Sequence, residues 1–265
     1  AVNWSKQQLF GGSIGTGVMM GKDAANKTRA LLVWGTSATG SVTANAVATV
    51  PAAVTDPLNG NVIDFSGEGQ HHNSQTAFRG GNGQVAFGAD NNGDYLAATV
   101  METVAGGGAA NPFNGLVVAK LDSAANVLGW STAAYVDAFG NKKPILDGSH
   151  AVIGECTELF NVTGGTPTGP SMSAPCLDSV GNLWFLSAVE LFTAGPRGTP
   201  GNDFDSALLR AVYDRASFGW NLELVLQLGQ VIHGRNSDRS YQIRFMGIAD
   251  SNSVSSGTMF SGNIL

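Results

Sequence analysis

The segment of the chain most suited to chemistry is residues 67–73, Gly-Glu-Gly-Gln-His-His-Asn, with Asp64 just upstream. The adjacent His71 and His72 would point to opposite faces of a strand, so only a loop lets both bind one metal. Three interpretations fit: a surface loop, a metal or ligand contact through Asp64, His71 and His72, and a catalytic base.

A second polar cluster is Asp-Asn-Asn-Gly-Asp at residues 90–94. Asp90, Asn92 and Asp94 offer the oxygen ligands that Ca²⁺ prefers, but the twelve-residue loop with its terminal bidentate Glu is absent. The alternative is a simple turn. Calcium is therefore the one cofactor that the sequence suggests.

Other catalytic patterns are missing from the sequence. No Ser lies in Gly-x-Ser-x-Gly, and neither Cys has a recognisable His partner. The Gly-rich residues 12–17 lack the Gly-Lys-Ser/Thr ending and the strand-to-helix context of a nucleotide-binding loop. Glu155 and Glu158 are an example of paired carboxylates, but glycoside hydrolysis requires a separation that only a structure gives. We assign no catalytic residue and favour a non-enzymatic protein.

The two cysteines, Cys156 and Cys176, lie 20 positions apart across Gly- and Pro-rich sequence. This spacing predicts a disulfide and an oxidising compartment, with two buried free thiols as the alternative. Asn-x-Ser/Thr sequons at Asn3, Asn26 and Asn161 are compatible with glycosylation of a secreted protein. We therefore expect an extracellular or periplasmic protein.

The composition is typical of a folded, turn-rich chain. Charged residues are only 13% of the total, 36 residues are Gly, and hydrophobic residues reach 43%. These values disfavour charged helical faces and disorder. The net charge of −6 and the lack of a basic cluster beyond Lys142-Lys143 argue against nucleic-acid binding. The sequence contains no apolar run of about 18 residues, the length that would predict a membrane span. Ala1 is compatible with a mature end left by processing.

Three apolar runs of strand length recur along the chain, at residues 29–35, 115–122 and 207–214. Counted from Leu31, Val117 and Leu208, the spacings are 86 and 91 residues, and the last two runs lead on to a Gly-Trp pair. Residues 220–234 begin with strand-like alternation and predict a half-buried strand that turns at Gly229.

A shorter repeat has the form Asp-x-x-Gly-Asn/Asp, at residues 90–94, 137–141 and 178–182. Its spacings of 47 and 41 residues match the size of a four-stranded propeller blade. A Gly-x-hydrophobic-x-Phe phrase occurs at residues 83–87 and 181–185 and, shortened, at 257–260. The sequence thus predicts an all-β repeat protein.

Residues 178–185, Asp-Ser-Val-Gly-Asn-Leu-Trp-Phe, resemble the blade turn of NHL-type and streptogramin-lyase-like β-propellers. The Gly-Gln-Val-Ala-Phe phrase and residues 222–230 are similar to propeller repeats of secreted bacterial proteins. The resemblance implies a propeller fold. It transfers no catalytic residue, because the chain lacks a matching lyase His/Glu constellation.

We therefore expect residues 1–265 to form a single β-propeller of six or seven short blades, with a β-sandwich or jelly roll as the alternative. The phrase at 257–260 predicts that a last unit begins there. Strands from the N-terminal region would complete it and close the ring, unless the chain is a fragment or another subunit supplies the strands.

The favoured function is a secreted, non-enzymatic structural or interaction protein that assembles with itself or with other surface components. A carbohydrate-binding or carbohydrate-cleaving propeller is the second hypothesis, with exposed Trp or Tyr side chains at its mouth. A viral or appendage shell protein is the third.

Overall fold

The computed structural model describes most of the middle of the chain as β-structure joined by turns. No helix occurs in the described residues, so none there could cross a membrane. The described residues are 2–3, 15–22, 29–36, 42–65, 85–103, 114–122, 126–137, 139–157, 172–173, 175–192, 203–235, 238–244 and 246.

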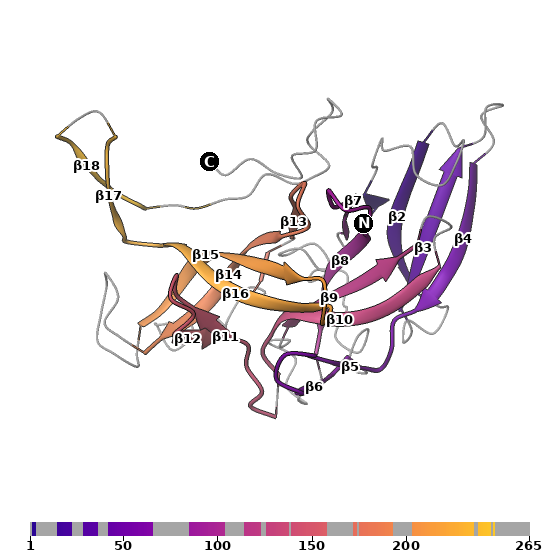
Figure 1. Cartoon of the computed structure of the whole chain (residues 1–265), viewed down its shortest axis with the longest axis horizontal. Helices are drawn as coiled ribbons and strands as arrows, with labels where there is room; N and C mark the ends of the chain where they lie inside the picture. Colours follow the sequence, from indigo (N-terminus) through magenta and orange to yellow (C-terminus); the bar gives the residue numbers. More distant parts are fainter. Residues whose placement is uncertain are drawn as a thin grey trace.

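Four antiparallel strands follow one another in space as in sequence three times along the chain (Figure 1). The first sheet comprises β1 (Val2–Asn3), β2 (Gly15–Lys22), β3 (Arg29–Thr36) and β4 (Val42–Thr49). The second comprises β7 (Val85–Ala89), β8 (Tyr95–Glu102), β9 (Asn114–Leu121) and β10 (Val127–Tyr135). The third run comprises β13 (Cys176–Leu177), β14 (Leu183–Leu191), β15 (Asp203–Asp214) and β16 (Gly219–Gln227).

The long-period repeat in the sequence marks equivalent strands of these three runs. Residues 29–35, 115–122 and 207–214 fall on β3, β9 and β15, each the third strand of its run. The two Gly-Trp pairs fall on β10 and β16, the fourth strands. The predicted strand after Trp220 is also confirmed, since β16 ends just before a turn in which Gly229 has a φ of 87°.

The arrangement of the strands contradicts a propeller of six or seven blades. Strands β11 (Pro144–Leu146) and β12 (Val152–Cys156) pair with each other, β11 runs parallel to β16, and β12 runs antiparallel to β14. The strands β11, β12, β14, β15 and β16 therefore close into a five-stranded barrel. The propeller prediction is wrong because β11 and β12 bridge β16 and β14 and close a barrel, whereas each blade of a propeller is a separate open sheet. The structure also does not show the alternative, a sandwich or jelly roll.

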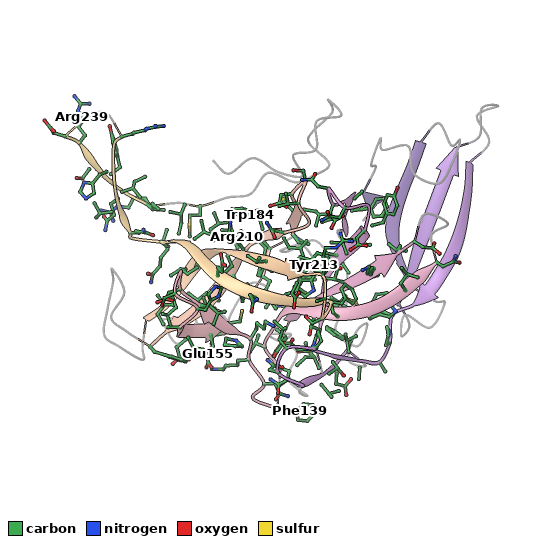
Figure 2. The ribbon with its side chains drawn as sticks, in the orientation of Figure 1. Phe139, Glu155, Trp184, Arg210, Tyr213 and Arg239 are labelled. Atoms are coloured by element: carbon green, nitrogen blue, oxygen red, sulfur yellow. The ribbon has the colours of Figure 1, made fainter. Side chains whose placement is uncertain are left out.

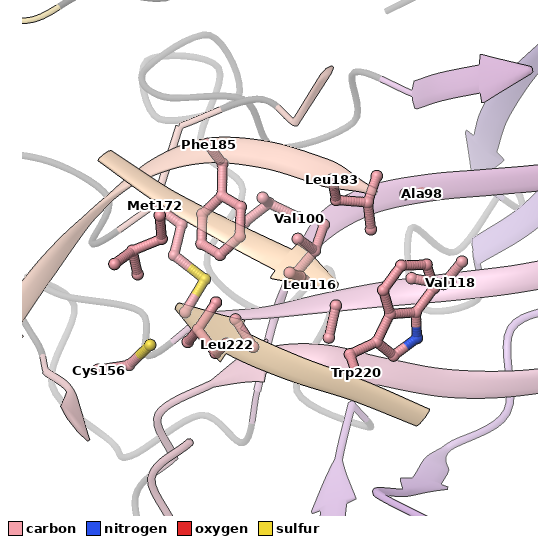
Figure 3. Close-up of a cluster of buried hydrophobic side chains, with 14 of the residues drawn as sticks. Ala98, Val100, Leu116, Val118, Cys156, Met172, Leu183, Phe185, Trp220 and Leu222 are labelled. Atoms are coloured by element: carbon pink, nitrogen blue, oxygen red, sulfur yellow. The ribbon is translucent and has the colours of Figure 1, made fainter. Parts of the chain in front are cut away.

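The sheet β7–β10 is buried on both faces, because successive residues of its central strands enter different apolar clusters. One cluster joins the sheet to the barrel and contains Leu116, Phe185 and Trp220 (Figure 3). From the sheet it includes Leu96, Ala98, Val100, Leu116 and Val118, whereas Ala97, Met101, Val117, Ala119 and Leu121 enter the other.

The second cluster is covered by a short hairpin made of β5 (Ala53–Thr55) and β6 (Val62–Asp64). Val54 and Ile63, which lie opposite each other in this hairpin, are both buried there. The turn that joins the two strands begins at Asp56. The hairpin thus brings the Asp56 carboxylate next to Tyr135, at the end of β10.

A two-stranded arm projects from the end of β16. It consists of β17 (Val231–His233) and β18 (Ser240–Gln242), and it stands away from the other labelled strands in Figure 1. All six of its strand residues are exposed. The predicted meeting of the chain ends involves residues 257–260 and the start of the chain at Ala1, which lie outside the described residues.

Barrel closure predicts the effect of replacing Gly154, which pairs with Leu191 where β12 meets β14. A Cβ atom at Gly154 would lie 2.5 Å from the Glu190 carbonyl oxygen and 3.1 Å from the Leu191 Cα. Because these are backbone atoms, Gly154→Ala should lower the free energy of unfolding by about 1–3 kcal/mol in urea denaturation. Gly148→Ala is the matched control, since nothing lies within 4 Å of its added Cβ. Equal stability of the two variants would contradict the closure.

Candidate functional sites

Within the described parts of the chain, five turns share one hydrogen-bond pattern built on a leading aspartate. In each turn the aspartate backbone N–H donates to the carbonyl four residues on, and its Oδ1 accepts the N–H of that same residue. The side chain thereby replaces backbone partners that a tight turn leaves unpaired. The leading residues are Asp90, Asp122, Asp137, Asp147 and Asp178. The turn interpretation of residues 90–94, 137–141 and 178–182 is confirmed.

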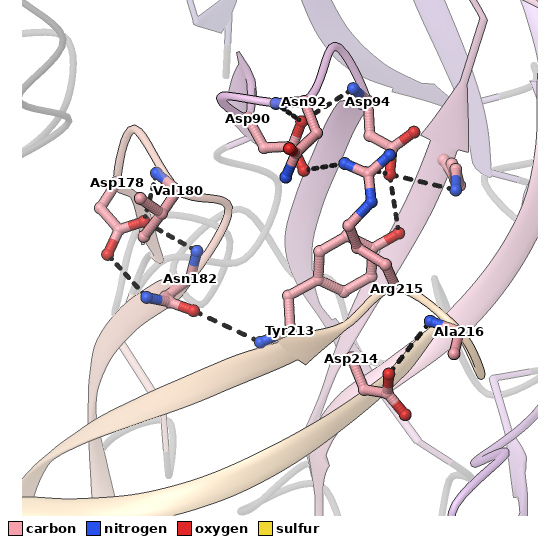
Figure 4. A network of polar contacts seen from close by, with 11 residues as sticks. Asp90, Asn92, Asp94, Asp178, Val180, Asn182, Tyr213, Asp214, Arg215 and Ala216 are labelled. Carbon is pink, nitrogen blue, oxygen red and sulfur yellow. Dashed lines mark hydrogen bonds and ion pairs between the residues drawn. The ribbon is translucent and has the colours of Figure 1, made fainter.

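The Asp90 turn is also bound by cations from elsewhere in the fold (Figure 4). Arg215, in the turn between β15 and β16, lies 2.6 Å from Asp90 Oδ2 and 3.1 Å from Asp94 Oδ2. Lys120 of β9 lies 3.1 Å from Asp94 Oδ2, and the Tyr213 hydroxyl lies 3.3 Å from that oxygen. The network connects the sheet β7–β10 to the barrel.

These contacts occupy carboxylate oxygens of Asp90 and Asp94, two of the three residues proposed as calcium ligands. Asp90 Oδ1 accepts two backbone N–H groups, from Asn92 and Asp94, each at 2.9 Å, and its Oδ2 faces Arg215. Burial opposes ionisation, but the two N–H groups and the guanidinium outweigh it and hold the pKa of Asp90 below its ordinary value. Two cationic side chains thus neutralise this acidic cluster. Among the described residues, no group of three or more His, Cys, Asp or Glu could hold a metal ion.

A second site is buried beneath the β5–β6 hairpin, where Asp56 meets Lys143 and Tyr135. Lys143 Nζ lies 2.6 Å from Asp56 Oδ2, and the side chains of both are almost fully inaccessible to solvent. The Tyr135 hydroxyl donates to the same Oδ2 at 3.0 Å. Asn59 and Asn61 donate to the tyrosine oxygen at 2.6 and 3.1 Å. The result is an ion pair closed off from water by a tyrosine and two amides.

The chain between β10 and β11 positions Lys143. Tyr135 is the last residue of β10, and the Asp137 turn folds the chain back so that Val136 pairs with Lys142. The Lys143 N–H then donates to the Tyr135 carbonyl at 2.9 Å, and the ammonium lies 5.9 Å from the tyrosine ring centroid. The recurring aspartate turn thus places the buried lysine next to the tyrosine.

Burial dominates the electrostatics of this site. Desolvation lowers the pKa of Lys143 although the Asp56 charge opposes the shift. Desolvation also raises the pKa of Tyr135, against hydrogen bonds from Asn59 and Asn61. The thiol of Cys156, whose backbone N–H donates to the Lys143 carbonyl, has its pKa raised to about 12, mainly by burial. All three shifts favour neutral side chains.

A third polar cluster lies on the barrel, where Glu155 of β12 is directly opposite Glu190 of β14. Lys142 Nζ contacts Glu155 and lies 3.3 Å from Glu190. Burial opposes the charged amine, but its contacts with both glutamates raise the pKa of Lys142. Because glycoside hydrolysis requires a protonated acid beside an ionised base, a lysine shared by both carboxylates suits a structural ion pair better.

The disulfide prediction is wrong: Cys156 and Cys176 are both buried and unbonded. Both pair with the same edge of β14, Cys156 opposite Val189 and Cys176 opposite Trp184. Five positions along a strand span about 16 Å, whereas the Cα atoms of a disulfide lie within about 7 Å of each other. The structure therefore matches the alternative, in which both thiols are buried and no disulfide joins them.

The other predicted site residues are only partly within the described chain. Asp64 is the last residue of β6 and pairs with Ala53, while His71 and His72 lie outside the described residues. Among the sequons, Asn3 lies on β1, and Asn26 and Asn161 lie outside the described residues.

Sequence reasoning missed the Asp56, Tyr135 and Lys143 cluster. Lys143 was noted in the sequence only as half of the Lys142-Lys143 pair. No sequence pattern pointed to Lys143, because a lysine is almost never fully buried without a partner and its partner lies 87 positions away. Neither a protein-family model nor a curated protein sequence matches this chain.

The Asp90 network predicts both a mutational and a pH effect. Asp90→Ala should lower the free energy of unfolding by about 2 kcal/mol at pH 7, because two backbone N–H groups lose their acceptor. The folded-state pKa of Asp90 lies below that of the unfolded chain. The contribution of Asp90 to the free energy of unfolding is therefore complete above about pH 4. It is lost as the pH falls through the folded-state pKa of Asp90. Urea denaturation between pH 7 and pH 3 measures both effects.

Asp147→Ala is the matched control, because Asp147 leads the same kind of turn but its hydrogen bond to the Ala151 N–H is exposed, whereas Asp90 is buried. It should cause a smaller loss than Asp90→Ala. Arg215→Gln should reduce the difference between the two aspartate variants. Equal losses for both would contradict a structural role for the Arg215 contact.

Proposed function

We propose that this protein is a secreted, non-enzymatic structural or interaction protein that assembles with further copies of itself through the β17–β18 arm. The proposal is supported chiefly by the exposed apolar residues of that arm. Val231, Ile232 and Tyr241 are 52%, 42% and 51% exposed. A two-stranded hairpin alone is marginally stable in water, so contact with a partner would favour this one.

The geometry of the arm supports docking by one face. Ile232 and Tyr241 are directly opposite each other on β17 and β18, so their side chains share a face of the ribbon. Two backbone hydrogen bonds stabilise the end of the arm next to β16. The Gly229 N–H donates to the Ile243 carbonyl, and the Ile243 N–H donates to the Gln230 carbonyl, each at 2.8 Å. The Gly234 N–H donates to the Arg239 carbonyl at 3.0 Å and closes the tip. Figure 2 places Arg239 at the end of the arm, away from the barrel.

Charge supports a second copy of the chain as the partner. Residues 230–244 contain three Arg and one Asp, a net charge of +2, whereas the other residues contain 11 basic and 19 acidic residues, a net charge of −8. An arm of one copy would therefore be attracted to the body of another, and the apolar pair would be buried on contact. Such a head-to-tail contact allows rings or open filaments.

The expected result is concentration-dependent assembly. Light scattering coupled to size exclusion should give a mass that rises with protein concentration and falls with added salt, because salt screens the charge attraction. Ile232→Glu should shift the protein to a monomer by placing a charge in the apolar contact. A wild-type protein that stays monomeric at high concentration would overturn the proposal.

Leu128→Glu is the matched control, because Leu128 is also a strand residue and is 61% exposed, but on β10 rather than on the arm. It should assemble like the wild type. If Leu128→Glu and Ile232→Glu reduce assembly equally, the contact does not depend on the arm.

A further inference from the structure

We infer that Lys143 and Asp56 are the reactants of an internal amide cross-link, formed by the protein on itself. The amine and the carboxylate are already in contact, with Nζ 2.6 Å from Oδ2. They are 87 positions apart in sequence, so a bond between them would covalently fasten the β5–β6 hairpin to the chain entering the barrel. The inference is independent of the self-assembly proposed above.

In water such a pair is unreactive, because the amine is protonated and the carboxylate is a poor electrophile. Burial changes this, since a low-dielectric site disfavours both charges and proton transfer within the pair gives a neutral amine and a neutral acid. The lowered pKa of Lys143 agrees with that tendency. Holding the two groups together supplies an effective concentration on the order of 10⁵ M or more.

The reaction is balanced without any other reactant. The ammonium transfers a proton to Asp56 Oδ2, and the Nζ lone pair attacks Cγ. The Nζ–Cγ bond forms, the Cγ–Oδ2 bond breaks, and Oδ2 leaves as water with protons that came from the amine. No atom is oxidised or reduced, and one ammonium and one carboxylate become one amide and one water.

Tyr135 is placed to relay a proton to the leaving oxygen. Its hydroxyl donates to Oδ2 at 3.0 Å, and its own oxygen accepts from Asn59 at 2.6 Å. The hydroxyl can give its proton to the departing Oδ2 and regain one from the attacking nitrogen. Its raised pKa keeps it protonated for this role.

Intact mass of the denatured full-length protein, expressed in bacteria, tests the inference. The wild type should be lighter than its sequence by about 18 Da, the mass of one water. Peptide mapping should then recover one branched peptide that joins the segments around Asp56 and Lys143. A wild-type mass equal to that of the sequence would overturn the inference.

Matched variants separate this cross-link from other losses of water. Cyclisation at Asp147-Gly148 would give the same mass change but would persist in Lys143→Met and Asp56→Ala, whereas the cross-link would be absent from both. Lys142→Met, which alters the neighbouring lysine, should keep the loss. Asp56→Asn should form the same amide with loss of ammonia, about 17 Da. A loss of water that persists in Lys143→Met would also overturn the inference.

Tyr135→Phe tests the relay without removing either reactant. Samples taken at intervals after refolding from urea should show the lighter species appearing more slowly than in the wild type, with circular dichroism confirming that the variant folds. An unchanged rate in the folded variant would assign the proton transfer to another group and remove Tyr135 from the mechanism.

Discussion

The rest of the structure depends on covering the sheet β7–β10 on both faces. Its central strands carry apolar residues at nearly every position, so one covering layer would leave half of them in water. The barrel covers one face and the β5–β6 hairpin covers the other. The Asp56 and Lys143 pair lies where these two covers meet. This ion pair fixes the hairpin relative to the chain that enters the barrel. Apolar packing is not directional, so it alone would not specify that alignment.

Sequence patterns predicted the local structure of this chain well. The aspartate turns were readable because a carboxylate, a residue with positive φ and a fixed spacing are all local requirements, met by Asp178 and Gly181 among others. The equivalent third strands were readable because length and apolar content repeat. In both cases the structural outcome is decided within about ten residues, so the neighbouring sequence contains the information.

The global arrangement was not readable, for a physical reason. Four consecutive antiparallel strands show the same local sequence pattern whether they form one blade of a propeller or part of a closed barrel. The closure is decided by β11 and β12, which are three and five residues long and too short to give a distinct pattern. Gly154, where β12 approaches the backbone of β14, was one glycine among 36. The absence of a disulfide follows from the same arrangement, since both β12 and β13 lie along one edge of β14.

Two contrasting groups of cations stand out among the residues that the structure describes. Lys120, Lys143 and Arg215 each bind an aspartate between elements, where a few cations fix how sheets and turns meet. The arginines of the arm, by contrast, are exposed at positions 235, 239 and 244. In a protein with only 13% charged residues, this separation matters. The lysines and the arginine that contact aspartates stabilise the fold. The exposed arginines of the arm instead attract an acidic partner through their positive charge.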